Sequence, residues 1–284
     1  MSETAFFKGT RVYLSGPMDF VPKRDVERAT GWRTRIKELM QSYGATVYDP
    51  WDKPDIRGLH EYGQEDIKMH HQRQNWSFAD TEEGAVARAK VASYFWETQH
   101  IDLRMVDVSD FVIAYCPTNI YSVGTAHEII LARSQHKPVL IVSPPIRLPA
   151  LENLRRKVSG NAELEGALDE LVGHVPIREN PTGTPSLWYM PLVHSEYFFD
   201  GFGFSDSQFW ERFPSWGQDS ELNRRETEVV VQRPLVPYLE KLARGEEVPR
   251  RWDHLGQKFV TDDDWLIMED THASREDGGL GRGK

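Results

Sequence analysis

DVSDFVIAYCPTNIYSVGTAHE, residues 107–128, is the stretch of sequence that decides the fold. Within it, residues 111–116 form an apolar run with the length and composition of a buried strand. A polar loop follows, and residues 129–132 are apolar at the start of a helical stretch. In an open α/β sheet, ligands bind where a loop leaves the carboxyl end of a strand and enters a helix. The free N–H groups of that helix attract anions, so the stretch predicts a ligand site with Glu128 in the first turn of the helix.

The segments on either side of this stretch predict the same architecture. Apolar patterning predicts strands at residues 11–15, 45–48 and 137–143, and helices at residues 25–43 and 84–108. A strand, a helix and a second strand in succession predict a right-handed crossover between parallel strands. We therefore predict an α/β fold, a Rossmann-like or flavodoxin-like open parallel sheet with helices on both faces.

The remaining segments do not follow the alternation of strand and helix. Residues 50–83 are polar and rich in His and Trp, and we interpret them as an ordered insertion within a first domain, 1–145. Residues 146–270 predict a helical and irregular, aromatic-rich C-terminal extension packed on that domain. Residues 271–284 lack core-forming side chains, which predicts a disordered tail.

Composition excludes several classes of function. A net charge of −10 argues against binding a nucleic acid polymer. The apolar runs are shorter than the ~18 residues of a membrane span, and no signal-peptide pattern is present, so we expect no membrane association and a cytoplasmic protein. The single cysteine, Cys116, is predicted to be a small core residue. His60, His70 and His71 lack a second cluster at ligand spacing, so we predict no metal site.

Polar residues converge on one edge of the predicted sheet. They belong to the loop at residues 15–17, to Asp102 on a helix, and to the loop at residues 122–128. Each has a structural alternative: Gly16-Pro17 as a turn, and Asp102 as a solvated or ion-paired residue. Their order along the chain favours a shared site.

That order resembles the nucleoside 2-deoxyribosyltransferase family, including its deoxynucleoside 5′-monophosphate N-glycosidase branch. Four blocks carry the resemblance: VYLSGP at 12–17, IDLRMVDVSDFVIAY at 101–115, SVGTAHEIILA at 122–132 and KPVLIV at 137–142. Family members that resemble phage-encoded proteins also share LSGPMDF, GWR and YGATVYDP in this order. The resemblance covers about residues 10–145.

The resemblance implies an enzyme that acts on an N-glycosidic bond. Glu128 would be the nucleophile that attacks the anomeric carbon of a deoxyribose and forms a glycosyl-enzyme ester, as in retaining glycosidases. Asp102 would be a general acid or an orienting carboxylate, and Tyr13 would approach the nucleophile or the sugar. The implied substrate-binding residues are Ser15, Gly16, Pro17, Asp19, Ser122, Gly124 and Thr125.

One position favours a monophosphate substrate. Free-nucleoside transferases commonly carry an acidic residue before the loop glycine, where this chain has Val123, preceded by Ser122. The resemblance also implies that no cofactor is needed and that the protein is a homo-oligomer. The sequence leaves open which base is released and whether water or a second base accepts the sugar.

Two other functions stay open. A cytokinin-type phosphoribohydrolase also uses a GT-x-x-E loop, but that family has a Gly-Gly pair where this chain has Ser122-Val123. A non-catalytic nucleotide-sensing module would keep the pocket without turnover. The presence of both Asp102 and Glu128 favours an enzyme, because binding alone does not require two carboxylates.

Overall fold

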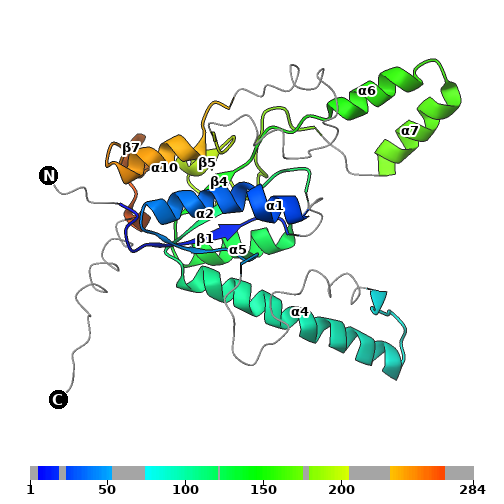
Figure 1. Cartoon of the computed structure of the whole chain (residues 1–284), viewed down its shortest axis with the longest axis horizontal. Helices are drawn as coiled ribbons and strands as arrows, with labels where there is room; N and C mark the ends of the chain where they lie inside the picture. Colours follow the sequence, from blue (N-terminus) through cyan, green and yellow to red (C-terminus); the bar gives the residue numbers. More distant parts are fainter. Residues whose placement is uncertain are drawn as a thin grey trace.

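The computed structural model describes residues 6–18, 24–52, 74–120, 122–174, 179–204 and 231–265 (Figure 1). Several predictions fall outside these residues. They concern Asp19, the three histidines and most of the insertion at 50–83, part of the aromatic C-terminal extension, and the tail at 271–284.

A five-stranded sheet forms the centre of the molecule. Its order is β2-β1-β3-β4-β5, and every neighbouring pair is parallel. The strands are β1 (Arg11–Ser15), β2 (Thr46–Tyr48), β3 (Phe111–Tyr115), β4 (Val139–Val142) and β5 (Phe198–Phe199). β3 and β4 are buried along their whole length, as expected for inner strands covered on both faces. This order is the flavodoxin-like one, and it confirms the predicted fold class.

The first crossover contains two helices where the periodicity predicted one. α1 (Arg24–Thr30) ends at Gly31, and α2 (Trp32–Ser42) follows directly. The Gly31 N–H donates to the Glu27 carbonyl at 2.7 Å, and a Cβ at Gly31 would lie 2.3 Å from the Glu27 carboxyl carbon. The glycine therefore lets the chain turn tightly around the Glu27 side chain before α2 begins.

The described part of the crossover to β3 contains one long helix, α4 (Glu82–Val108), of 27 residues. The Thr81 side chain caps it by accepting the Gly84 N–H. Met105 and Val106, near its carboxyl end, are buried against the sheet, whereas its amino-terminal part extends away from the body (Figure 1). Asp110 then accepts the Arg11 backbone N–H at 2.7 Å and fixes the start of β3 beside β1.

Helices cover both faces of the sheet. α5 (Val123–Ser134) connects β3 to β4 and lies with α4 on one face. α1, α2 and α10 (Leu235–Ala243) lie on the other face (Figure 1). Right-handed crossovers produce this division, because the chain moves from β1 to β2 in one direction and from β3 to β4 in the other. No helix of the described residues is long and apolar enough to cross a membrane.

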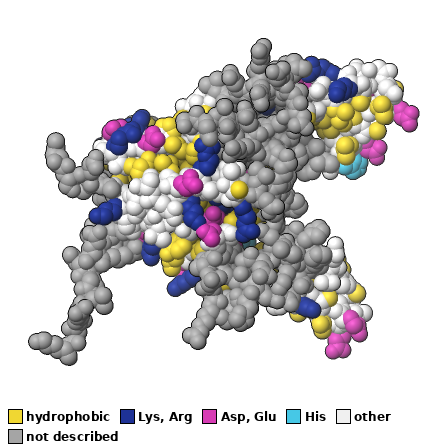
Figure 2. Space-filling model, viewed as in Figure 1, with side chains coloured by type: hydrophobic (Ala, Val, Ile, Leu, Met, Phe, Trp, Pro, Cys, Tyr) yellow, Lys and Arg dark blue, Asp and Glu magenta, His cyan; other side chains and the backbone are white. Residues whose placement is uncertain are grey.

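The C-terminal half contributes to the same sheet and core. A helical hairpin, α6 (Pro149–Val158) and α7 (Ala162–His174), projects from the body and exposes apolar side chains (Figures 1 and 2). The 3-10 helix η1 (Ser195–Tyr197) then leads into β5. After α10, the hairpin of β6 (Arg250–Asp253) and β7 (Lys258–Thr261) leads to Trp265. Trp265 is 2% exposed and packs against Phe111 of β3, with ring centroids 5.4 Å apart. The domain boundary at residue 145 stays a prediction.

Candidate active site

Two hydroxyl groups of β1 hold the Glu128 carboxylate. The Tyr13 hydroxyl donates to Oε1 at 2.8 Å, and the Ser15 hydroxyl donates to Oε2. Tyr13 and Ser15 are two residues apart on one strand, so their side chains point to the same face of the sheet. Glu128 lies on the buried face of α5, but in its second turn and not in the first turn as predicted, because the helix already begins at Val123. The sequence-predicted residues Tyr13, Ser15 and Glu128 are therefore in direct contact.

This contact lies at the point where the strand order reverses. β1 continues to β2 on one side and pairs with β3 on the other. In the flavodoxin-like order, the crevice outside the carboxyl ends of β1 and β3 is the usual ligand site. Ser15 is the last residue of β1, and α5 begins after the loop that leaves β3.

Burial and nearby negative charge keep Tyr13 protonated. Burial raises the pKa of Tyr13 well above its usual value, and the charges of Glu128 and Asp102 raise it further. Tyr13 is therefore a hydrogen-bond donor to Glu128 throughout the neutral range. Asp102, half-buried near the carboxyl end of α4, lies close enough to Tyr13 to act on it electrostatically.

The start of α5 combines open space with polar groups. The Ser122 hydroxyl forms a hydrogen bond with the Thr125 hydroxyl at 2.7 Å and does not cap the helix N–H groups. Thr125 is 2% exposed and lies one turn before Glu128 on the same face. Among the described residues, a Cβ at Gly124 would have no atom within 4 Å apart from its chain neighbours and the backbone of its own helix. The first turn of α5 can therefore accept an anion beside the Glu128 carboxylate.

Gly16 and Pro17 have a structural explanation. A Cβ at Gly16 would lie 2.9 Å from the Trp32 ring and 3.3 Å from the Tyr115 carbonyl oxygen. The backbone at Gly16 thus approaches the Trp32 side chain of α2, and its role in substrate binding stays a prediction. The Pro17 carbonyl points inward and accepts a hydrogen bond from Arg33 at 3.3 Å.

Arg33 is a supporting residue that the sequence did not identify. Its guanidinium donates to the carbonyl oxygens of Leu14 at 3.4 Å and Gly16 at 2.7 Å, on either side of Ser15. The side chain is 2% exposed in α2, with the guanidinium carbon 4.7 Å from the centroid of Trp32 and 5.3 Å from that of Trp51. The guanidinium therefore fixes the end of β1. In the sequence, Arg33 belongs to the block GWR at 31–33. An arginine in a helix usually lies on the surface, so this block did not indicate a buried supporting residue.

The C-terminal half reaches the same edge of the sheet. The Asn180 amide donates to the Thr118 hydroxyl in the β3–α5 loop at 3.1 Å. Burial raises the pKa of Tyr189 to about 12, with a further contribution from Cys116. Burial also raises the pKa of the Cys116 thiol, and the charge of Glu128 adds to this. Cys116 is therefore an inert thiol between the candidate nucleophile and the C-terminal half.

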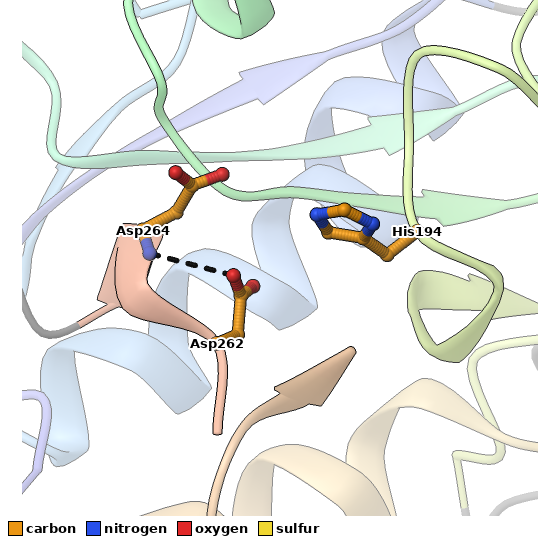
Figure 3. A group of neighbouring side chains, drawn as sticks. All are labelled: His194, Asp262 and Asp264. Carbon is orange, nitrogen blue, oxygen red and sulfur yellow. Dashed lines mark hydrogen bonds between the residues drawn. The ribbon is translucent and has the colours of Figure 1, made fainter. Parts of the chain in front are cut away.

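A second group of polar side chains lies elsewhere. His194, Asp262 and Asp264 have ligand-type atoms within 4.8 Å of one another (Figure 3). Positive groups already balance both carboxylates: Arg133 contacts Asp264 at 2.8 Å, and Arg251 lies 3.9 Å from Asp262.

The Tyr197 hydroxyl also donates to Asp262, at 2.5 Å. Because charge and hydrogen bonds are satisfied without an ion, the group fits an ion-pair network better than a metal site. Its members join the segment after β7 to the carboxyl end of α5.

Comparisons with known proteins leave the family undetermined. No model of a known protein family matches the chain, and no curated protein matches it either. Among solved structures, the chain is similar to a conserved protein from Enterococcus faecalis V583, with 19% identity and a TM-score of 0.32. The match covers 65% of this chain and 86% of that one. This degree of likeness carries no argument about function.

Proposed function

We propose that the protein breaks the N-glycosidic bond of a 2′-deoxynucleotide, with Glu128 as the nucleophile. The observation that carries the proposal is the buried Glu128 carboxylate, held by Tyr13 and Ser15 beside an open helix N-terminus at the β1/β3 edge. The resemblance of residues 10–145 to the nucleoside 2-deoxyribosyltransferase family supports the choice of reaction.

In the proposed first step, a Glu128 oxygen attacks the anomeric carbon of the sugar. The bond from that carbon to the base nitrogen breaks, and the electron pair leaves with the base. In this proposal, Asp102 supplies or orients the proton that the departing base takes up. The product is a glycosyl ester of Glu128.

In the second step, water or another base attacks the same carbon, the ester bond breaks, and the proton that the attacking group loses returns to Asp102. This restores the carboxylate and completes either hydrolysis or transfer. Tyr13, which stays protonated, donates to the carboxylate before attack and after release.

We further propose a 5′-monophosphate as the substrate. The support is the first turn of α5, where Ser122 and Thr125 offer hydroxyls and Gly124 leaves open space next to the helix N–H groups. A phosphate in this position would benefit from the helix dipole and lie one turn from Glu128. Val123, 45% exposed, adds no negative charge that would repel it.

Chromatographic detection of free base tests this function. The protein is incubated with deoxynucleosides, their 5′-monophosphates and the matching ribonucleotides. We expect base release from at least one deoxynucleoside monophosphate and slower release from the free nucleoside. Preferred release from ribonucleotides would favour the phosphoribohydrolase, and nucleotide binding without base release from any substrate would favour the sensing module.

Glu128→Gln is the companion variant. It keeps the size of the side chain and removes the nucleophilic carboxylate, so we expect base release to fall by at least about 10³-fold. A melting temperature close to that of the unmodified protein is the control for folding. If Glu128→Gln releases base at the original rate, Glu128 is not the nucleophile.

A further inference from the structure

The Ser15 hydroxyl contacts the candidate nucleophile. Ser15 is 0% exposed, and its hydroxyl is hydrogen-bonded to Oε2 of Glu128. We propose that Ser15 is a positioning residue for Glu128 and does not bind the substrate. This inference rests on the proposed function, in which Glu128 attacks the sugar.

The two hydroxyls donate to different oxygens of the Glu128 carboxylate. Tyr13 holds Oε1 and Ser15 holds Oε2, so together they fix the rotation of the carboxylate about its last carbon–carbon bond. A single donor would restrain only one of the two oxygens. Two donors from one face of one strand therefore keep the attacking oxygen at a constant place relative to the helix start.

The position of Ser15 is itself fixed from two sides. Ser15 pairs with Ala114 in the register of β1 and β3. On the other side, the Arg33 guanidinium holds the carbonyls of the two neighbouring residues, Leu14 and Gly16. The backbone that carries Ser15 is therefore held on both sides, which favours a preorganised contact with Glu128.

The Ser15 hydrogen bond also favours the ionised form of the carboxyl. A donor to a carboxylate stabilises the charged state relative to the neutral acid. A hydrogen bond to a charged group contributes enough to move a titration by roughly one pH unit or more. Without Ser15, the Glu128 carboxyl should stay protonated, and so unable to attack, up to a higher pH.

The variant Ser15→Ala tests the inference through the pH profile of base release. We expect the acid limb of kcat/KM to move upward by about one pH unit, with KM changed less than twofold. If Ser15 binds the substrate instead, KM rises and the acid limb stays in place, which overturns the proposal.

A second measurement does not depend on activity. Carbon NMR of protein labelled at the glutamate carboxyl carbon follows the titration of Glu128, whose signal is identified by its loss in Glu128→Gln. We expect Ser15→Ala to shift this titration upward, even if the protein releases no base. An unchanged titration overturns the positioning role, whatever the activity.

Ser143→Ala is a matched control for these measurements. Ser143 follows β4 directly, is 1% exposed, and its hydroxyl has no hydrogen-bond partner among the described residues. It is thus a buried serine at a strand end without a link to Glu128, and its removal should leave the Glu128 titration in place. An equal shift in both variants would assign the effect to loss of packing and would contradict the inference.

Discussion

At the scale of single residues, the candidate site depends on side chains that hold other side chains. Tyr13 and Ser15 contact Glu128 directly, and Arg33 holds the backbone that carries Ser15. The sequence predicted the first three as site residues but assigned Ser15 to the substrate. The contact of Ser15 with Glu128 depends on which face of β1 meets α5, and sequence spacing does not determine that.

Replacement of Arg33 by methionine should lower the free energy of unfolding by about 3–5 kcal/mol. The methionine fills part of the space but leaves three carbonyl oxygens without their donor and Asp49, 3.9 Å away, without its cation. Urea denaturation measures the change. The exposed pair of Arg155 and Asp169 provides the control, because Arg155→Met should cost less than about 1 kcal/mol. Equal losses in the two variants would contradict the structural role of Arg33.

At the scale of elements, the segment from β3 through α5 is predicted well by the sequence. Its buried strand is continuously apolar and its helix contains the apolar run at residues 129–132, so local pattern and tertiary environment agree. β5 could not be predicted in this way. It has two residues, Phe198 and Phe199, within an aromatic region, and it is a strand only because β4 offers it an edge.

A Gly124→Ala variant separates the stability of α5 from its proposed role in phosphate binding. Within the described part of the chain, the added methyl group meets no atom within 4 Å outside its own helix segment, and it reduces backbone freedom, so the free energy of unfolding should rise by about 0.5–1 kcal/mol. The same methyl group would occupy space needed by a phosphate. We expect KM for a monophosphate to rise roughly tenfold, the effect of losing about 1.4 kcal/mol of binding. Thermal melting and steady-state kinetics give the two values, and an unchanged KM would argue against a phosphate at this helix start.

At the scale of the whole molecule, the two halves of the chain form one core. Tyr197, Phe199 and Trp265 belong to the same buried cluster as β1, β3 and β4. The cluster of His194, Asp262 and Asp264 (Figure 3) adds a polar connection, because Asp264, in the segment after β7, pairs with Arg133 of α5. Contacts between residues far apart in sequence leave no periodic signal. Neither the shared core nor this polar connection could therefore be predicted from the sequence alone.

The His194 environment predicts a pH dependence of stability. Burial lowers the pKa of His194 below its ordinary value of about 6.5. As the pH falls through that value, the unfolded chain takes up a proton that the folded chain does not, so the folded state loses stability until the pH passes the lower folded pKa.

We expect His194→Gln to lose less stability than the unmodified protein as the pH falls below about 6.5. The slope of the free energy of unfolding against pH should differ by the equivalent of up to one bound proton, and urea denaturation at several pH values measures it. His174→Gln is the matched control, because it removes a histidine that is exposed at the end of α7. Identical slopes for His194→Gln and the unmodified protein would exclude His194 as the source.

The late position of β5 and Trp265 also has a consequence for synthesis on the ribosome. β4 ends at Val142, yet Phe198 and Phe199, which pair with its outer edge, emerge more than fifty residues later. Trp265, which packs on Phe111, emerges later still. Until then the nascent chain carries an open parallel edge and an uncovered apolar face, the two features that most favour aggregation. A chain cut after residue 145 would keep both permanently, although it retains Tyr13, Ser15 and Glu128.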